Sequence, residues 1–149
     1  MSPPARTLTQ AQEAHLLAVA QDRPSNARAV TQHALAVAGM LRFDRAPMGI
    51  TPSGAAHAAH LLGVHVGPEF TAWVQALADR DEAWRARNEA WMKARYACQR
   101  VYDFADLGLV KTRIAEFEAA DAAWTATVPR EDRERAAALR VLRAGGGGR

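Results

Sequence analysis

The feature that most constrains this chain is an apolar stripe with a spacing of seven residues, which runs through its middle third. The five members of the stripe are Phe70, Leu77, Trp84, Trp91 and Cys98. A spacing of seven keeps side chains on one face of a long helix, and that face must pack against another helix. The stripe therefore predicts a long helix that begins at Glu69 and ends near residues 106–108, together with a helical partner for it.

A second apolar stripe predicts this partner helix. Its members are Val110, Ile114, Phe117, Trp124 and Val128, and Asp121 interrupts it. We expect an antiparallel hairpin that turns near Gly108. Because Pro129 has no amide hydrogen to donate, we expect it to end the second helix, with a trailing helix up to about residue 143. The glycine run then predicts a flexible tail over residues 144–149.

Charge is distributed unevenly over this hairpin. Residues 80–100 carry six basic groups against three acidic ones, whereas residues 103–128 carry two against five. This favours two helices that fold against each other, and phosphate binding along the basic helix is the second interpretation. Two thin helices cannot bury every side of such aromatic stripes, so we expect a homodimer or a protein partner. The residues assigned to this interface are Phe70, Leu77, Trp84 and Trp91.

Residues 8–62 have the pattern of short helices around a small hairpin. Thr9 and Gln12 form a capping box that predicts a helix over residues 9–21. Ser25 is the expected N-cap of a second helix, which Gly39 ends. Residues 41–43 and 48–50 are the expected strands of a hairpin. Thr51 or Ser53 is then expected to cap a third helix that runs to about residue 62.

Three motifs in this region carry a resemblance to a known family. They are the pair Ala34-Leu35, the turn Gly39-Met40-Leu41 and the closing motif Ile50-Thr51-Pro52-Ser53-Gly54. On these motifs, residues 8–62 resemble the compact winged helix-turn-helix domains of small phage and prophage proteins. The resemblance covers residues 8–62 only; together with the two apolar stripes and the glycine run it predicts a mainly α chain with three parts. Residues 8–62 would form a small winged helix with a two-stranded wing. Residues 69–143 would form the hairpin and trailing helix, as an oligomerisation or docking module, and residues 144–149 the tail.

The resemblance also implies that the second helix is a DNA recognition helix. Such a helix reads base edges through Asn, Gln and Arg, while Arg and Lys hold phosphates. The expected nucleic-acid-binding residues are Asn26, Arg28, Thr31 and Gln32 on or near this helix, and Arg42 and Arg45 at the wing. A symmetric dimer assembled through the hairpin would present two such helices to double-stranded DNA, about one helical turn apart. The first functional hypothesis is therefore a DNA-binding regulatory or phage-type protein.

The same helix supports a rival hypothesis, because residues 34–38 read Ala-Leu-Ala-Val-Ala and offer little to DNA. A helix so poor in basic residues favours a non-enzymatic, protein-binding adaptor or inhibitor. Within this class, the layout suits a phage anti-defence protein such as an anti-CRISPR. It also suits a packaging adaptor similar to small terminase subunits, which join a helix-turn-helix to oligomerising helices.

No catalytic or cofactor-binding motif stands out. The three serines lie outside a Gly-x-Ser-x-Gly motif, and the single cysteine falls on the apolar stripe. His57 and His60 could face one metal ion, but zinc needs three or four ligands. We therefore expect no enzyme activity, no cofactor and no metal. The chain has no apolar run of about 18 residues and no apolar signal-peptide core, which predicts a cytoplasmic protein without a membrane span.

Overall fold

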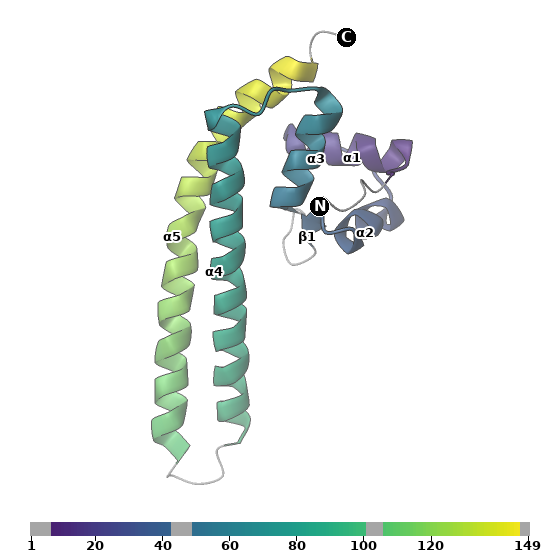
Figure 1. The fold of residues 1–149 in the computed structure, drawn as a ribbon. Helices are drawn as coiled ribbons and strands as arrows, with labels where there is room; N and C mark the ends of the chain where they lie inside the picture. Colours follow the sequence, from purple (N-terminus) through teal and green to yellow (C-terminus); the bar gives the residue numbers. More distant parts are fainter. Residues whose placement is uncertain (1–6, 43–48, 101–105, 147–149) are drawn as a thin grey trace, which may run out of the picture. The chain divides into compact units, whose positions relative to one another are not determined.

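The computed structural model describes residues 7–42, 49–100 and 106–146. Within these ranges it is mainly helical, with one small two-stranded sheet (Figure 1). The elements are, in chain order, α1 (Gln10–Ala20), α2 (Ala29–Val37), β1 (Leu41–Arg42), β2 (Gly49–Ile50), α3 (Pro52–Leu62), α4 (Pro68–Gln99) and α5 (Leu107–Gly146). The predicted class, short N-terminal elements with a small hairpin followed by long helices, is confirmed at this level.

The chain divides into two compact units. The first unit takes the described residues up to Val74 and those from Arg135 onward, and the second unit is Gln75–Glu134. Helices α4 and α5 each contribute residues to both units. The start of α4 and the C-terminal end of α5 thus belong with the N-terminal elements, whereas the sequence placed all of residues 69–143 in one hairpin module.

The helix caps of the first unit follow the sequence with one exception. The capping box of α1 is present, since Gln12 N donates to Thr9 Oγ1 at 3.3 Å and Thr9 N donates to Gln12 Oε1 at 3.0 Å. The prediction that Ser25 caps α2 is wrong. Helix α2 begins four residues later with Arg28 at its N-cap, because the Ser25 hydroxyl makes a local turn with Ala27 N and bonds to a histidine ring instead.

The predicted hairpin is present, and its closing motif ties α3 to the preceding turn. Leu41 pairs with Ile50 in antiparallel register, while residues 43 and 48, also expected in the strands, lie outside the described residues. Thr51 caps α3: its hydroxyl accepts from Gly54 N at 3.0 Å and donates to the carbonyl of Gly39 at 2.5 Å. A Cβ atom on Gly54 would collide with the carbonyl oxygen of Met40, so the motif requires glycine there.

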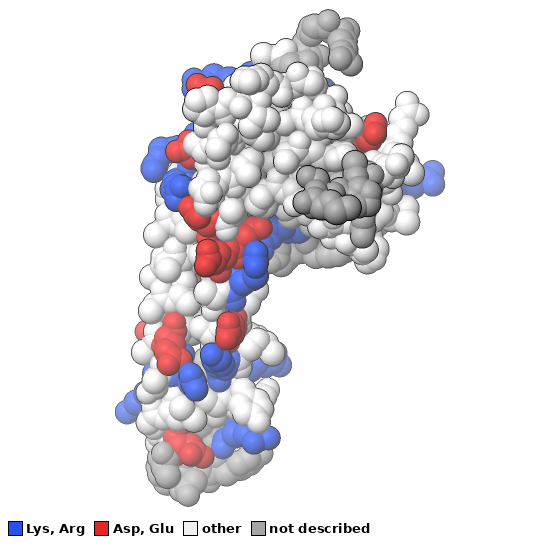
Figure 2. Space-filling view, in the orientation of Figure 1, with Lys and Arg blue, Asp and Glu red and all other residues white. Residues whose placement is uncertain are grey.

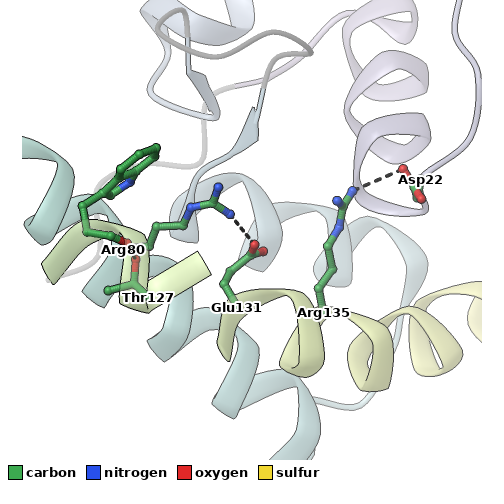
Figure 3. A network of polar contacts seen from close by, with 6 residues as sticks. Asp22, Arg80, Thr127, Glu131 and Arg135 are labelled. Atoms are coloured by element: carbon green, nitrogen blue, oxygen red, sulfur yellow. Dashed lines mark hydrogen bonds and ion pairs between the residues drawn. The ribbon is translucent and has the colours of Figure 1, made fainter. Parts of the chain in front are cut away.

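The core of the first unit draws on four helices. Leu16, Leu35, Trp73 and Leu142, from α1, α2, α4 and α5 respectively, are its largest fully buried side chains. Polar contacts fix the end of α5 on the end of α1. The buried Gln21 amide donates to the carbonyl of Leu142 at 3.0 Å, and Arg143 Nε donates to the carbonyl of Gln21 at 3.1 Å. Arg135 also pairs with Asp22 at 3.4 Å (Figure 3).

The second unit is the predicted antiparallel pair of helices, α4 and α5 (Figure 1). Helix α4 ends at Gln99 and not near residues 106–108 as predicted, because α5 already begins at Leu107. Arg87 pairs with Asp121 at 2.5 Å, and Arg130 pairs with Asp79 at 2.7 Å. The first pair has the predicted polarity, a base on α4 and an acid on α5, whereas the second pair has the reverse. Asp121, which interrupts the second apolar stripe, stands there as the partner of Arg87.

Three predictions about the second helix are wrong. Helix α5 runs through Pro129 without a break, its first turn already contains Gly108, and it extends to Gly146. Two threonine hydroxyls beside Pro129 donate to helix carbonyls, Thr125 to Asp121 at 2.8 Å and Thr127 to Trp124 at 2.6 Å. On the turn that follows Pro129, ion pairs with α4 hold the helix in place. Together with the hydroxyl bonds, they offset the roughly 3 kcal/mol that an interior proline costs. Of the predicted tail, residues 144–146 are helical, and residues 147–149 lie outside the described part.

Candidate functional site: a groove between α1 and α2

An open groove of about 1160 Å³ lies in the first unit, between α1 and the segment that leads into α2. Pockets for small molecules usually measure about 300–1,000 Å³ and enclose their ligand, whereas this groove is slightly larger and open. It is lined by two sets of residues, an apolar floor and a polar rim.

The floor consists of small and aliphatic side chains. They are Ala11, Ala14, Leu17 and Ala18 from α1, with Ala27 and Val30 from the opposite wall. The α1 residues recur at intervals of three and four, which places them along one face of the helix. Val30 is 71% exposed, an unusual value for a valine on a helix of a folded unit. Ala11, Ala14 and Val30 are thus apolar floor residues that the described chain leaves exposed, whereas Ala18 is buried.

The rim supplies positive charge and hydrogen-bonding groups. Arg23, Asn26 and Arg28 are all exposed there, and Thr31 is half-buried. Among the described residues that line the groove, none carries a carboxylate. Arg28 makes no side-chain cap for α2, so the amide end of that helix adds its partial positive charge to the same side. The groove thus combines an apolar floor with a cationic rim.

His15 is buried in the wall of the groove, only 7% exposed. Its Nδ1 lies 2.7 Å from the Ser25 hydroxyl, a hydrogen bond that joins α1 to the segment before α2. Burial lowers the pKa of His15 below its ordinary value of 6.5, because an imidazolium would lose hydration there. A neutral ring at pH 7 therefore holds the two walls together.

The predicted DNA-binding residues have different positions in the structure. Three of them, Asn26, Arg28 and Thr31, come together at the groove. Gln32 is half-buried, and its amide donates to the carbonyl of Ala27 at 3.2 Å, so it is occupied within the chain. Arg42 is half-buried on β1 and already interacts with another group of the chain. Arg45 lies outside the described residues.

Sequence reasoning missed His15, Arg23 and the alanines of α1. The spacing of Ala11, Ala14 and Ala18 was a usable signal, because small residues at such intervals mark a helix face that admits close approach. That these alanines face α2 was not predictable, since the direction of α2 depends on the turn between Asp22 and Arg28. Asp22 has φ of 53°, a left-handed conformation that redirects the chain at the end of α1.

The predicted interface residues of the hairpin separate into buried and exposed ones. Phe70 and Leu77 are 2% and 4% exposed, so they are core residues of the chain itself rather than surface available to a partner. Trp84 is half-buried against Trp124, with ring centroids 5.0 Å apart. Trp91 remains 42% exposed, and on α5 Leu107 and Ile114 are exposed to 40% and 39%.

Two of the six basic residues within residues 80–100, Arg80 and Arg87, are paired with α5, and the other four are exposed. Arg87 lies 5.0–5.3 Å from the rings of Trp84, Phe117 and Trp124 in addition to its pair with Asp121. Arg80 pairs with the buried Glu131 (Figure 3). Figure 2 shows basic and acidic side chains close together along this unit. Arg80 and Arg87 are therefore engaged within the hairpin and do not take part in an exposed basic surface along α4.

The described part of the chain holds neither a metal-binding cluster nor a membrane-spanning helix. There, no three His, Cys, Asp or Glu residues gather in a way that could hold a metal ion. The His57 and His60 rings are 6.5 Å apart on α3 without a third partner of that kind. No helix within residues 7–42, 49–100 and 106–146 is both long and apolar enough to cross a membrane.

Comparison of the chain with protein-family models, curated proteins and solved structures finds no match.

Proposed function

We propose that this chain is a non-enzymatic, protein-binding adaptor whose first unit receives a segment of another protein in the groove between α1 and α2. The observation that carries the proposal is the groove itself, an open cavity of about 1160 Å³ with an uncovered apolar floor. Uncovered apolar surface of this kind is typical of protein interaction sites.

The shape and polarity of the site favour a peptide over a DNA duplex. A duplex is held by cations on a protruding element, several of which contact phosphates. Here three of the candidates, Asn26, Arg28 and Thr31, line a concavity. Two other arginines of the unit are occupied, since Arg135 pairs with Asp22 and Arg143 donates to a backbone carbonyl.

The order α1, α2, β1, β2, α3 supports an abbreviated winged helix as the scaffold of this site. In a complete helix-turn-helix another helix lies between the first helix and the recognition helix. Here eight residues, 21–28, join α1 to α2, and the groove lies alongside this connection. On this view the partner segment fills the place of the missing helix.

A peptide-display selection on the immobilised full chain tests the proposal. The Ala14→Arg variant fills the groove with a long side chain, and Ala56→Arg is the matched control, since Ala56 is exposed on α3 and away from the groove. We expect enriched peptides to be retained by the wild type and by A56R but lost by A14R. Equal retention by A14R, or no enrichment at all, would refute the proposal.

DNA binding is the second candidate, and one observation favours it. Asn26 and Arg28 are exposed at the amino end of α2, where a recognition helix makes its contacts. Fluorescence anisotropy of mixed-sequence duplex DNA across a salt series tests this reading. Binding that weakens steeply with salt supports it, and no binding at low salt excludes it for the isolated protein.

We further propose that the hairpin assembles the protein into a homodimer. Trp91 on α4 and Ile114 and Leu107 on α5 remain about 40% exposed near one end of the unit. Leu107 and Ile114 are seven residues apart and so share one face of α5. A second copy would cover this surface in the manner of a four-helix bundle.

A further inference from the structure

We infer that the natural occupant of the α1–α2 groove is an amphipathic helix with a small apolar face and acidic flanks. The inference rests on the proposed adaptor function and names its partner by chemistry. Three features of the groove lead to it: the spacing of the floor residues, the charge of the rim and the orientation of α2.

The floor fits a helix. Ala11, Ala14 and Leu17, which are exposed or half-buried, cover about 9 Å along α1, between one and two helical turns. Alanine side chains let a second helix approach to the lower end of the usual 8–10 Å interaxial range. Leu17 and Val30 stand on either wall and would contact aliphatic side chains of the incoming face. An extended peptide has no comparable match, because the described sheet is not part of the groove.

The rim selects for acidic residues. Arg23 and Arg28 both line the groove, and no carboxylate does so among the described lining residues. The N-cap of α2 lacks a side-chain cap, so this helix end offers amide donors on the same side. A partner with Glu or Asp beside its apolar face would satisfy all these groups, and one with Lys there would be repelled.

The charge also discriminates among occupants from within this protein. Residues 1–6 read Met-Ser-Pro-Pro-Ala-Arg, with one arginine and no acidic residue, so this segment lacks the required charge. A second copy could offer only its acidic stretches, residues 79–82, 116–121 and 131–134. In each of them one carboxylate already pairs with an arginine of the hairpin, Asp79 with Arg130, Asp121 with Arg87 and Glu131 with Arg80. A separate protein is therefore the occupant that the groove favours.

The experiment uses two synthetic, fluorescein-labelled peptides of about 18 residues, above the length at which isolated helices are marginal. Both carry Leu and Ala on one face. One has Glu on its flanks and the other has Lys at the same positions. Their binding to the full chain is measured by fluorescence anisotropy, with sedimentation to detect binding of a second copy.

We expect the Glu peptide to bind and the Lys peptide not to bind. Arg28→Glu should weaken the Glu peptide about tenfold, while Arg85→Glu, the same change at an exposed site on α4, should have no comparable effect. Ala14→Arg should abolish binding although it adds a positive charge, and Ala56→Arg should preserve it.

The inference is overturned if the Glu peptide fails to bind, if both peptides bind equally, or if R28E and R85E behave alike. Self-association that A14R abolishes would instead identify a second copy as the occupant and would also overturn it. The adaptor proposal has a separate criterion. It survives if display enriches peptides of another composition that A14R loses, and it fails if display enriches none.

Discussion

Replacing Gly54 with alanine tests whether the closing motif of the hairpin is held by a backbone contact. The added Cβ would collide with the carbonyl oxygen of Met40 and lie 3.0 Å from Ile50 Cγ1. The Met40 carbonyl cannot move away freely, because it accepts a hydrogen bond from Thr51 N at 3.1 Å. The strain must therefore be taken up by α3 or by the turn at Gly39.

The expected cost follows from two opposing terms. Overpacking of a close contact costs about 1–3 kcal/mol, and a backbone neighbour places this case at the upper end. Alanine in a helix recovers at most about 1 kcal/mol relative to glycine. We expect a net loss of about 2 kcal/mol in the free energy of unfolding, equivalent to a fall in Tm of about 4–8 °C for a chain of this size.

Urea denaturation followed by circular dichroism at 222 nm measures this loss, and Gly108→Ala is the matched control. Gly108 also lies in the first turn of a helix, α5, but nothing stands within 4 Å of its added Cβ. G108A should leave stability unchanged or raise it by up to about 1 kcal/mol. If G54A and G108A shift the unfolding midpoint in the same direction, the contact with Met40 does not fix the motif.

Three further predictions concern other parts of the chain. Because burial lowers the pKa of His15, the unfolded chain takes up more protons than the folded one as the pH falls below 6.5. The free energy of unfolding should therefore drop in that window. His15→Gln should remove this pH dependence in denaturation curves recorded from pH 7.5 to 5. Arg87→Ala should lower the free energy of unfolding by about 2 kcal/mol, since it removes three ring contacts and the pair with Asp121; a loss no greater than that of Arg85→Ala would contradict this. Ile114→Glu should convert a dimer to monomer in sedimentation velocity, whereas Thr112→Glu should not; a wild-type monomer would exclude the proposed homodimer.

The sequence predicted those elements of the fold whose signals are local. The Thr9–Gln12 capping box, the end of α2 at Gly39 and the Thr51 cap each depend on residues within one turn, and all are present. The long helices followed from apolar spacing alone. Pro129 misled because its local effect is real, but neighbouring ion pairs and hydroxyls outweigh it, and such tertiary contacts are not visible in a single stretch of sequence.

The site was less predictable than the fold for a related reason. A side chain must be exposed to bind a partner, but the spacing of apolar residues does not tell which face of a helix another part of the chain will cover. Phe70 and Trp91 belong to the same stripe, yet one is 2% and the other 42% exposed. Gln32 has the chemistry of a base-reading residue, but a backbone carbonyl five residues away occupies its amide. The sequence identified Asn26, Arg28 and Thr31 one by one, but it did not predict the concavity that brings them together.

The two functional candidates share Arg28, so reversing its charge cannot separate them. Both duplex DNA and an acidic helix would lose affinity when Arg28 becomes Glu. Ala14→Arg does separate them, because its added positive charge favours DNA whereas its added bulk blocks a helix. It adds a cation to a surface that already carries Arg23 and Arg28, which should leave a phosphate backbone held equally or more tightly. The same side chain occupies the apolar floor and should exclude a helix from the groove. An A14R protein that gains DNA affinity and loses peptide affinity would therefore assign the groove to a protein partner, whatever the strength of non-specific DNA binding.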